Sequence, residues 1–209
     1  MQPYYQEQGI TIYHGDCRDI LPTLAPVDLV LTDPPYGISK WSATGGNSLR
    51  QNEVDMIRVW DVAPSAETLR LVVSAGRYAI VWGGNYFADA LGGFRSPLVW
   101  DKQIRGMHFA DGEMAWTNFD FSTLRIFTYP VASSDVKGKR VHPTQKPIAL
   151  LRWCIQQCKS ANTILDPFMG SGTTLRAAKD LGRKAIGIEI EERYCEIAAT
   201  RLQQEVFAL

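Results

Sequence analysis

Two short apolar runs, each ending at an aspartate followed by proline, most constrain how this chain can fold. Residues 27–32, before Asp33, and residues 163–165, before Asp166, are too short for helices, and most of their side chains are apolar. Such runs are typical of strands buried on both faces of a parallel sheet. The intervening segments 53–73 and 147–157 carry apolar residues at helical spacing. We therefore predict an α/β fold, with a mostly parallel sheet and helices on both faces.

Other segments extend this alternation along the chain. Further strands are predicted at 9–13, 78–82, 97–100 and 184–190, and further helices at 18–21, from 172 to about 180, and at 191–207. The region 101–140 has no clear period and is predicted to be irregular and rich in turns. Because 209 residues show no linker and no repeat, we predict a single domain over residues 1–209.

Composition excludes several classes of protein. The chain is 45% hydrophobic and 21% charged, as in ordinary globular domains. It has no run of about 18 apolar residues and no secretory start, so we expect no membrane partner. The cysteines form no C-x-x-C pair and the three histidines are scattered, so we expect no metal site, reduced thiols and a cytoplasmic location.

The residues after the first apolar run suit the binding of an amino group. Pro34 and Pro35 have a fixed φ, and each restricts the residue before it to an extended conformation. The Asp33 carboxylate and the Pro34 carbonyl then present two acceptors, which match the two donors of an –NH₂ group, and Tyr36 offers a ring for stacking. The same residues also suit a plain turn in which the aspartate caps the strand.

The second apolar run leads into a glycine loop. Gly170-Ser171-Gly172 follows Asp166 and opens a predicted helix, and glycines allow a ligand to approach the backbone closely. Glu189 follows 17 residues after Gly172, at a distance suited to ribose hydroxyls. Leu175 stands where a dinucleotide fingerprint would have its third glycine, so this loop alone is a weak signal for an adenosine-containing ligand.

Together the two elements resemble the S-adenosylmethionine-dependent DNA amino-methyltransferases, which modify adenine N6 or cytosine N4. The family's catalytic motif is present as residues 33–36 and its cofactor motif as residues 166–174. Residues 81–87, 99–102 and 142–147 also follow the family's order. The catalytic motif precedes the cofactor motif, as in the family's circularly permuted β group. The resemblance implies the Rossmann-like fold of S-adenosylmethionine-dependent methyltransferases.

The resemblance also assigns roles to residues. It implies that Asp33, Pro34, Pro35 and Tyr36 hold a flipped-out base for direct methyl transfer. It places the cofactor, S-adenosylmethionine, against Asp16, Lys146, Asp166, Pro167, Phe168, Gly170, Ser171, Gly172, Thr173 and Glu189. Within this set, Glu189 is expected on the ribose hydroxyls, Asp16 near the adenine and Lys146 near the methionine carboxylate. Aspartate at the first position of the catalytic motif, here Asp33, favours adenine N6 over cytosine N4 as the target.

The charge distribution bears on DNA as the partner. The formal net charge is zero, but residues 1–35 carry −4 and residues 121–160 carry +6. We expect short DNA-contact inserts at about 38–52 and 103–141, with Lys137, Lys139 and Arg140 as candidate phosphate contacts. A solvated loop is the plain alternative for this basic cluster. The resemblance also suggests a homodimer, which would add DNA-recognition surface that these short inserts lack.

Four other functions are weighed against adenine-N6 transfer. Cytosine-N4 transfer uses the same site. Transfer to an RNA or protein amino group is more distant, because glutamine-modifying relatives typically begin the motif with Asn. A nicotinamide-dependent oxidoreductase gives residues 33–36 no task. A catalytically inactive nucleic-acid-binding module conflicts with the intact Asp33, Tyr36 and glycine loop.

Overall fold

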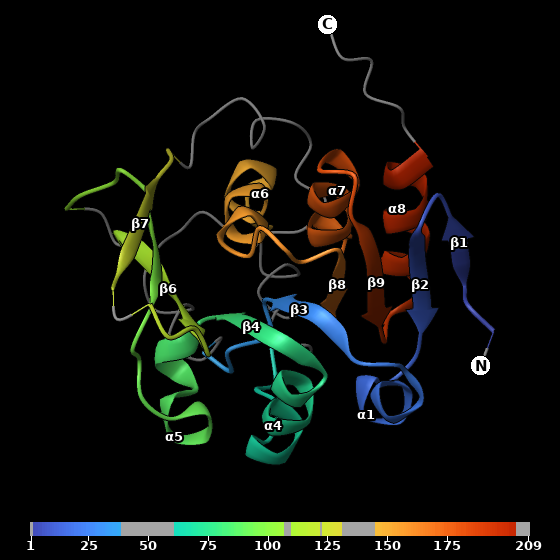
Figure 1. Cartoon of the computed structure of the whole chain (residues 1–209), viewed down its shortest axis with the longest axis horizontal. Coiled ribbons are helices and arrows are strands. Elements are labelled where there is room, and N and C mark those ends of the chain that lie inside the picture. Colours follow the sequence, from blue (N-terminus) through green and yellow to red (C-terminus); the bar gives the residue numbers. More distant parts are fainter. Residues whose placement is uncertain (1, 39–60, 107–109, 122, 131–144, 204–209) are drawn as a thin grey trace, which may run out of the picture.

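The computed structural model describes residues 2–38, 61–106, 110–121, 123–130 and 145–203. Within these residues, the strands form one sheet (Figure 1). Its order is β1 (Tyr5–Glu7), β2 (Ile10–His14), β9 (Lys184–Glu189), β8 (Thr163–Asp166), β3 (Val27–Thr32), β4 (Gly76–Trp82), β6 (Gly112–Thr117), β5 (Leu98–Asp101) and β7 (Arg125–Thr128). The five strands from β2 to β4 are mutually parallel. The mostly parallel sheet is confirmed.

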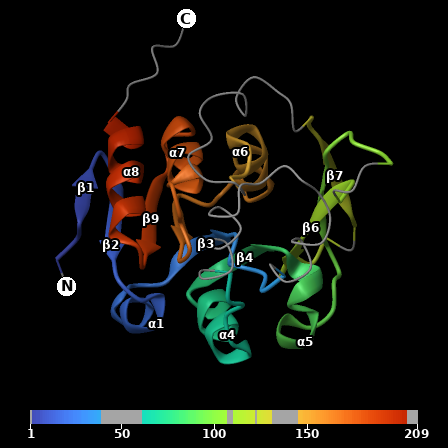
Figure 2. The same ribbon diagram turned by 180° about the vertical axis from the view of Figure 1, so that it is seen from behind.

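Helices cover both faces of this sheet, as predicted (Figures 1 and 2). One face carries α6 (Ile148–Gln157), α7 (Thr173–Asp180) and α8 (Glu192–Gln203), and the other carries α1 (Cys17–Ile20), α4 (Ala66–Ser74) and α5 (Ala88–Leu91). Short 3₁₀ turns, η1 (Leu21–Thr23) and η2 (Gly84–Tyr86), follow α1 and β4. Within the described residues, no helix is both long and apolar enough to cross a membrane.

Strand β3 shows how the sequence produces the two buried faces. Leu29 and Leu31 pack into the core beneath α6, α7 and α8, whereas Val30 points into the core beside α1 and α4. All three side chains are fully buried, because successive strand residues point to opposite faces and both faces are covered. The near-continuous apolar run is therefore required by burial on both sides.

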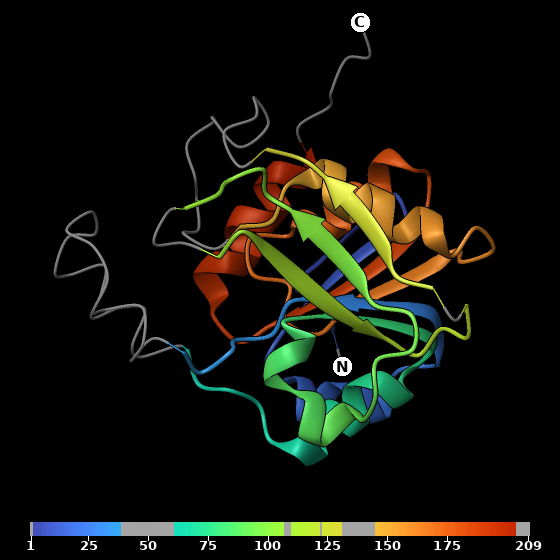
Figure 3. The ribbon, with the colours of Figure 1, turned by 90° about the vertical axis from the view of Figure 1, so that its left-hand side faces the viewer.

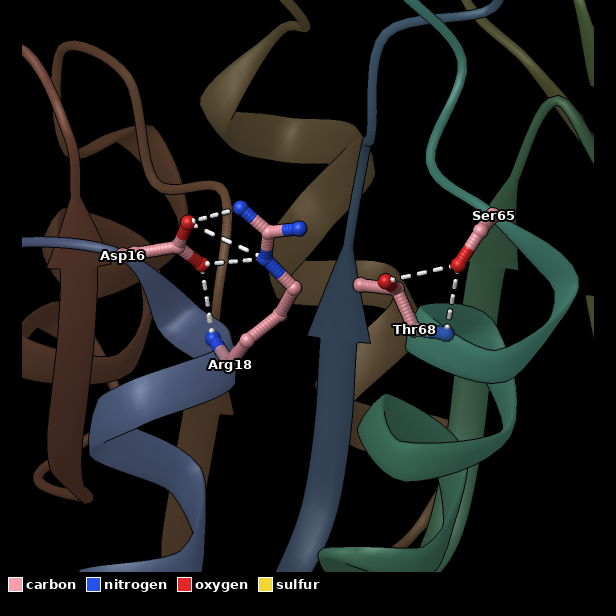
Figure 4. A network of polar contacts seen from close by, with 4 residues as sticks. All are labelled: Asp16, Arg18, Ser65 and Thr68. Carbon is pink, nitrogen blue, oxygen red and sulfur yellow. Dashed lines mark hydrogen bonds and ion pairs between the residues drawn. The ribbon is translucent and has the colours of Figure 1, made fainter.

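Two of the helices begin at polar caps that the sequence supplies (Figure 4). The Ser65 side chain accepts a hydrogen bond from the Thr68 backbone N–H at the start of α4. Asp16 does the same for the Arg18 N–H at the start of α1. Such caps satisfy backbone donors that have no partner inside the helix. The predicted helical segment before Pro64 falls largely outside the described residues.

The prediction of an irregular region at 101–140 is wrong for its described part. Strand β6 lies antiparallel between β4 and β5, and β7 adds a parallel edge beside β5 (Figure 3). Gly112 and Glu113 open β6, and neither residue type favours a strand. Pairing with β4 and β5 fixes this conformation, so local propensity gave no signal for it. Strand β1 was also not predicted.

Candidate active site

The two predicted strand ends meet at one edge of the sheet. Because β3 and β8 are neighbouring parallel strands, their carboxyl ends lie side by side. A pocket opens there, and its lining includes Asp33 and Lys146 together with Asp166 and the glycine loop. The other loop residues in this lining are Phe168, Met169, Gly170, Ser171 and Thr173. The structure thus brings the two motifs together around a common pocket.

Asp33 is held by two donors in this pocket. Lys146 Nζ donates to Asp33 Oδ2 at 2.6 Å, and the Tyr36 hydroxyl donates to Asp33 Oδ1 at 2.5 Å. Burial raises the pKa of the Asp33 carboxyl, although the Lys146 ammonium opposes that rise. The side chain is still 27% exposed, whereas that of Lys146 is 5% exposed. Asp33 is therefore the member of this pair that an entering ligand can reach.

Glu113, to which the sequence assigned no role, completes an ion network behind Asp33. Its Oε2 lies 2.9 Å from Lys146 Nζ, and its Oε1 lies 2.6 Å from Lys102 Nζ. Burial alone would raise the pKa of Glu113, but the two ammonium groups lower it to about 2. Burial likewise opposes the charge on Lys146, yet Asp33 and Glu113 raise the pKa of Lys146 well above its usual value. The Lys146 ammonium is therefore held between the Asp33 and Glu113 carboxylates.

Tyr36 belongs to an aromatic cluster beside Asp33. Its ring stacks on Tyr86 at 5.0 Å between centroids, and Phe87 meets it edge-on at 6.0 Å. Gly83 lies against the same ring, and a Cβ added there would come within 2.2 Å of it. Burial raises the pKa of the Tyr36 hydroxyl well above its usual value. The ring is thus placed beside the carboxylate that its hydroxyl contacts.

The glycine loop is shaped by backbone conformation and close packing. Gly170 and Gly172 have φ values of +49° and +78°, which favour glycine. A Cβ on Gly172 would lie 2.8 Å from that of Ala198 in α8. The Arg201 side chain of the same helix donates to the Ser171 hydroxyl at 2.9 Å. The loop conformation therefore depends on α8 as well as on its own glycines.

Asp166 is a buried carboxylate at the base of this loop. Thr32 Oγ1 donates to it at 2.7 Å and the Phe168 N–H at 3.2 Å. Burial raises its pKa to about 6, against the lowering effect of these hydrogen bonds. Because burial makes the negative charge of Asp166 unfavourable, a cationic ligand bound nearby would stabilise the ionised carboxylate.

Glu189 and Asp16 continue the acidic edge across β9 and β2. Glu189 accepts hydrogen bonds from the backbone N–H groups of Gly170 and Glu191, both at 2.9 Å. Burial raises the pKa of Glu189. Asp16 is paired with the Arg18 guanidinium, whose hydrogen bonds lower the pKa of this carboxyl (Figure 4). Glu189 ends β9, which pairs with β8, and Asp16 follows β2, which pairs with β9. Neither residue lies in the lining of the pocket given above.

The four carboxylates Asp33, Asp166, Glu189 and Asp16 thus follow four adjacent parallel strands. Such a row of acceptors suits an elongated ligand with hydroxyl and amino donors and positive charge. S-Adenosylmethionine has this donor set in its ammonium, sulfonium, ribose hydroxyls and adenine amino group. The residues present therefore fit the cofactor that the resemblance implied.

Several predicted residues receive no test here. Lys137, Lys139 and Arg140 lie outside the described residues, as does most of the predicted insert at 38–52. Lys146 lines the pocket, but its ammonium is turned to Asp33 and Glu113, so a contact to the methionine carboxylate stays a prediction. The four cysteines are buried and free, with no disulfide among them.

Known methyltransferases are similar in sequence to this chain. A family model described as DNA methylase matches residues 51–200. Type II methyltransferase M.ScaI of Streptomyces caespitosus is 28% identical over 100% of this chain and 86% of its own length. M.HinfI of Haemophilus influenzae, another type II methyltransferase, is 27% identical over 93% of this chain and 68% of its own.

Solved structures show the same similarity. The crystal structure of an M1.HpyAVI–SAM complex superposes with a TM-score of 0.59 at 27% identity, covering 93% of this chain and 100% of that one. PvuII DNA methyltransferase, described as cytosine-N4-specific, has a TM-score of 0.66 at 16% identity, covering 99% and 91%. At that identity the second similarity shows the fold alone.

Proposed function

This chain belongs to the DNA methylase family, and on that premise we propose that it methylates the N6 amino group of adenine in DNA. It is a DNA amino-methyltransferase whose cofactor is S-adenosylmethionine. The observation that carries the proposal is the position of Asp33, which opens the sequence Asp-Pro-Pro-Tyr beside the pocket that contains the glycine loop. Aspartate at this place, rather than serine, is the feature that favours adenine.

The proposed mechanism depends on positioning and on a proton acceptor. The Asp33 carboxylate and the Pro34 carbonyl accept hydrogen bonds from the target amino group, which orients the nitrogen lone pair, and Tyr36 packs against the flipped-out base. When bound, S-adenosylmethionine would supply an activated methyl group, and its sulfur would leave with the electrons of the broken carbon–sulfur bond. The nitrogen then holds a surplus proton, which passes to an Asp33 carboxylate oxygen. Burial raises the pKa of Asp33 and so makes it a better acceptor.

We assign the cofactor to the glycine-loop side of the same pocket. Asp166, Pro167, Phe168, Gly170, Ser171, Gly172 and Thr173 would surround its methionine and ribose, with Glu189 at the ribose and Asp16 near the adenine. The buried Asp166 carboxylate and the backbone φ values at Gly170 and Gly172 support this assignment. The DNA-contact role of the segments at 38–52 and 103–141 stays a prediction, as do the single-domain organisation, the circular permutation and the homodimer.

The test is to identify the methylated nucleoside. The protein is incubated with S-adenosylmethionine carrying a labelled methyl group and with DNA of varied sequence, and the DNA is digested to nucleosides. We expect the label in N6-methyldeoxyadenosine. Label in N4-methyldeoxycytidine would reassign the base to cytosine, and label in RNA or protein substrates alone would overturn DNA as the substrate.

Cofactor affinity is expected to fall as the solution becomes acidic, because Asp166 must be ionised to hold a cationic ligand. Burial raises its pKa to about 6 in the free protein, and the bound cation would lower it again. Below pH 6, binding must therefore release a proton, so affinity falls by up to about tenfold per pH unit. Titration calorimetry at about pH 7.5 and about pH 5 measures this difference, which should approach roughly tenfold.

The Asp166→Asn variant separates this effect from other carboxyl groups. It should bind the cofactor more weakly near neutral pH, because the negative charge is gone. Its affinity should then change less between the two pH values than that of the wild type. If the variant keeps the wild-type slope, another group controls the pH dependence and the role given to Asp166 is wrong.

A further inference from the structure

Four buried or half-buried ions form a chain behind the proposed catalytic carboxylate. Lys146 Nζ lies between Asp33 Oδ2 at 2.6 Å and Glu113 Oε2 at 2.9 Å. Lys102 Nζ lies 2.6 Å from the other oxygen of Glu113. Two carboxylates thus alternate with two ammonium groups. Lys146 is the most buried member, so its charge depends on both neighbours.

This arrangement conflicts with the task proposed for Asp33. Its two oxygens already accept hydrogen bonds from Lys146 and Tyr36, so the target amino group would share the carboxylate with the Lys146 ammonium. Positive charge also develops on the amino nitrogen as the new N–C bond forms. An ammonium held on the same carboxylate opposes that charge, and the opposition is strong in a buried site. A shift of Lys146 away from Asp33 would remove this opposition when the base enters.

Glu113 offers the displaced ammonium a second acceptor without any exposure to water. Nζ is already within 2.9 Å of Glu113, so release from Asp33 requires only a small shift toward β6. The other groups that face Lys146 are the Tyr36 hydroxyl at 3.1 Å and the rings of Tyr36 and Trp82. Neither ring nor hydroxyl provides a full negative charge. Among the described neighbours of Lys146, Glu113 is the carboxylate left to pair with it.

We infer that Glu113 is a positioning residue for methyl transfer, which holds the Lys146 ammonium while the amino group of the target base replaces that ammonium on Asp33. The inference rests on the proposed function. It adds a residue from β6 to a site otherwise built from the ends of β3 and β8. It also gives Lys146 a role that does not require contact with the cofactor.

The first test compares single-turnover methyl transfer by the wild type and Glu113→Gln. The amide keeps the shape but loses the charge, so Lys146 stays on Asp33, and the transfer rate should fall roughly 10- to 100-fold. The dissociation constant for S-adenosylmethionine should stay within about threefold. Glu113→Asp keeps the charge and should recover part of the rate. Glu7→Gln removes an exposed carboxylate on the edge strand β1 and should transfer at the wild-type rate.

The second test needs no cofactor and measures DNA binding. A duplex that the wild type methylates is compared with one in which the amino group of the target base is replaced by hydrogen. The wild type should prefer the amino-bearing duplex by about tenfold, the value of a hydrogen bond to a charged acceptor. In Glu113→Gln this preference should shrink to about twofold or less, because Lys146 blocks the acceptor. If the role of Glu113 were purely structural, Glu113→Gln would weaken the binding of both duplexes equally.

The outcomes separate the inference from the proposed function. If the wild type methylates no DNA, both fail together. If it methylates DNA but Glu113→Gln transfers at the wild-type rate, or keeps the full preference for the amino-bearing duplex, the inference alone is wrong. If Glu113→Gln does not fold, Glu113→Asp carries the test. It should then transfer more slowly than the wild type and the Glu7→Gln control, and a rate equal to that of the control contradicts the inference.

Discussion

Replacing Asp33 with alanine should lower methyl transfer to DNA by roughly 10³-fold or more, the range expected when a positioned acceptor for the reacting group is removed. The variant keeps the Pro34 carbonyl but loses the carboxylate that would orient the amino group with it, and also the acceptor for the proton. Cofactor affinity should change little, because Asp166 and the glycine loop belong to a different strand end. The variant is expected to bind S-adenosylmethionine but not to transfer its methyl group to DNA.

Single-turnover transfer and titration calorimetry measure these two quantities on the same preparation. Glu7→Ala is the matched control, since that carboxylate is exposed on the edge strand β1 and does not line the pocket. Lys146 keeps Glu113 as a partner in Asp33→Ala, so its buried charge is not left alone. A transfer rate within about tenfold of the wild type would show that Asp33 is not the acceptor.

Gly83→Ala is expected to have the second-largest effect, because it would push Tyr36 out of place. The new Cβ would lie 2.2 Å from Cε1 of the Tyr36 ring and 2.6 Å from two further ring atoms. The ring must move, and its hydroxyl would then lose the hydrogen bond to Asp33. Methyl transfer should fall by roughly 10- to 100-fold, as expected when positioned catalytic contacts are lost.

Gly182→Ala controls for backbone strain in this experiment. Gly182 has φ +65°, close to the +71° of Gly83, but no atom lies within 4 Å of its added Cβ. Both variants should lose a similar amount of thermal stability from the left-handed backbone, about 1 kcal/mol each. Only Gly83→Ala should also lose methyl-transfer activity. Equal activities in the two variants would show that the position of Tyr36 is not critical.

The positions of Asp33 and Asp166 could be predicted because each follows a short buried strand. A parallel sheet places the carboxyl ends of its strands at one edge, so local pattern was enough to bring these two residues together. Glu113 could not be found in this way. It opens a strand with weak local propensity, and it reaches Lys146 through the pairing of β6 with β4, which no local signal encodes.

The same distinction applies to the fold. Strands such as β3 are specified by their own apolar residues, and its predicted bounds are confirmed. Strands β6 and β7 are specified by their neighbours instead, and β7 is largely exposed. For such strands the pairing partner, rather than the side chains, determines the conformation. The contacts of Lys146 also depended on this tertiary pairing.

The order of strands in the sheet has a consequence for how the protein is made. Strand β2 is synthesised early, but its parallel neighbour β9 pairs with it from 175 residues later, and β8 pairs with β3 from 135 residues later. A growing chain that ends before residue 163 would contain Asp33 yet leave β2 and β3 without these neighbours. Contacts between such distant segments form slowly and leave strand edges open to other chains in the meantime. Binding of the cofactor should therefore mark the completion of folding, since the edge that holds it is assembled last.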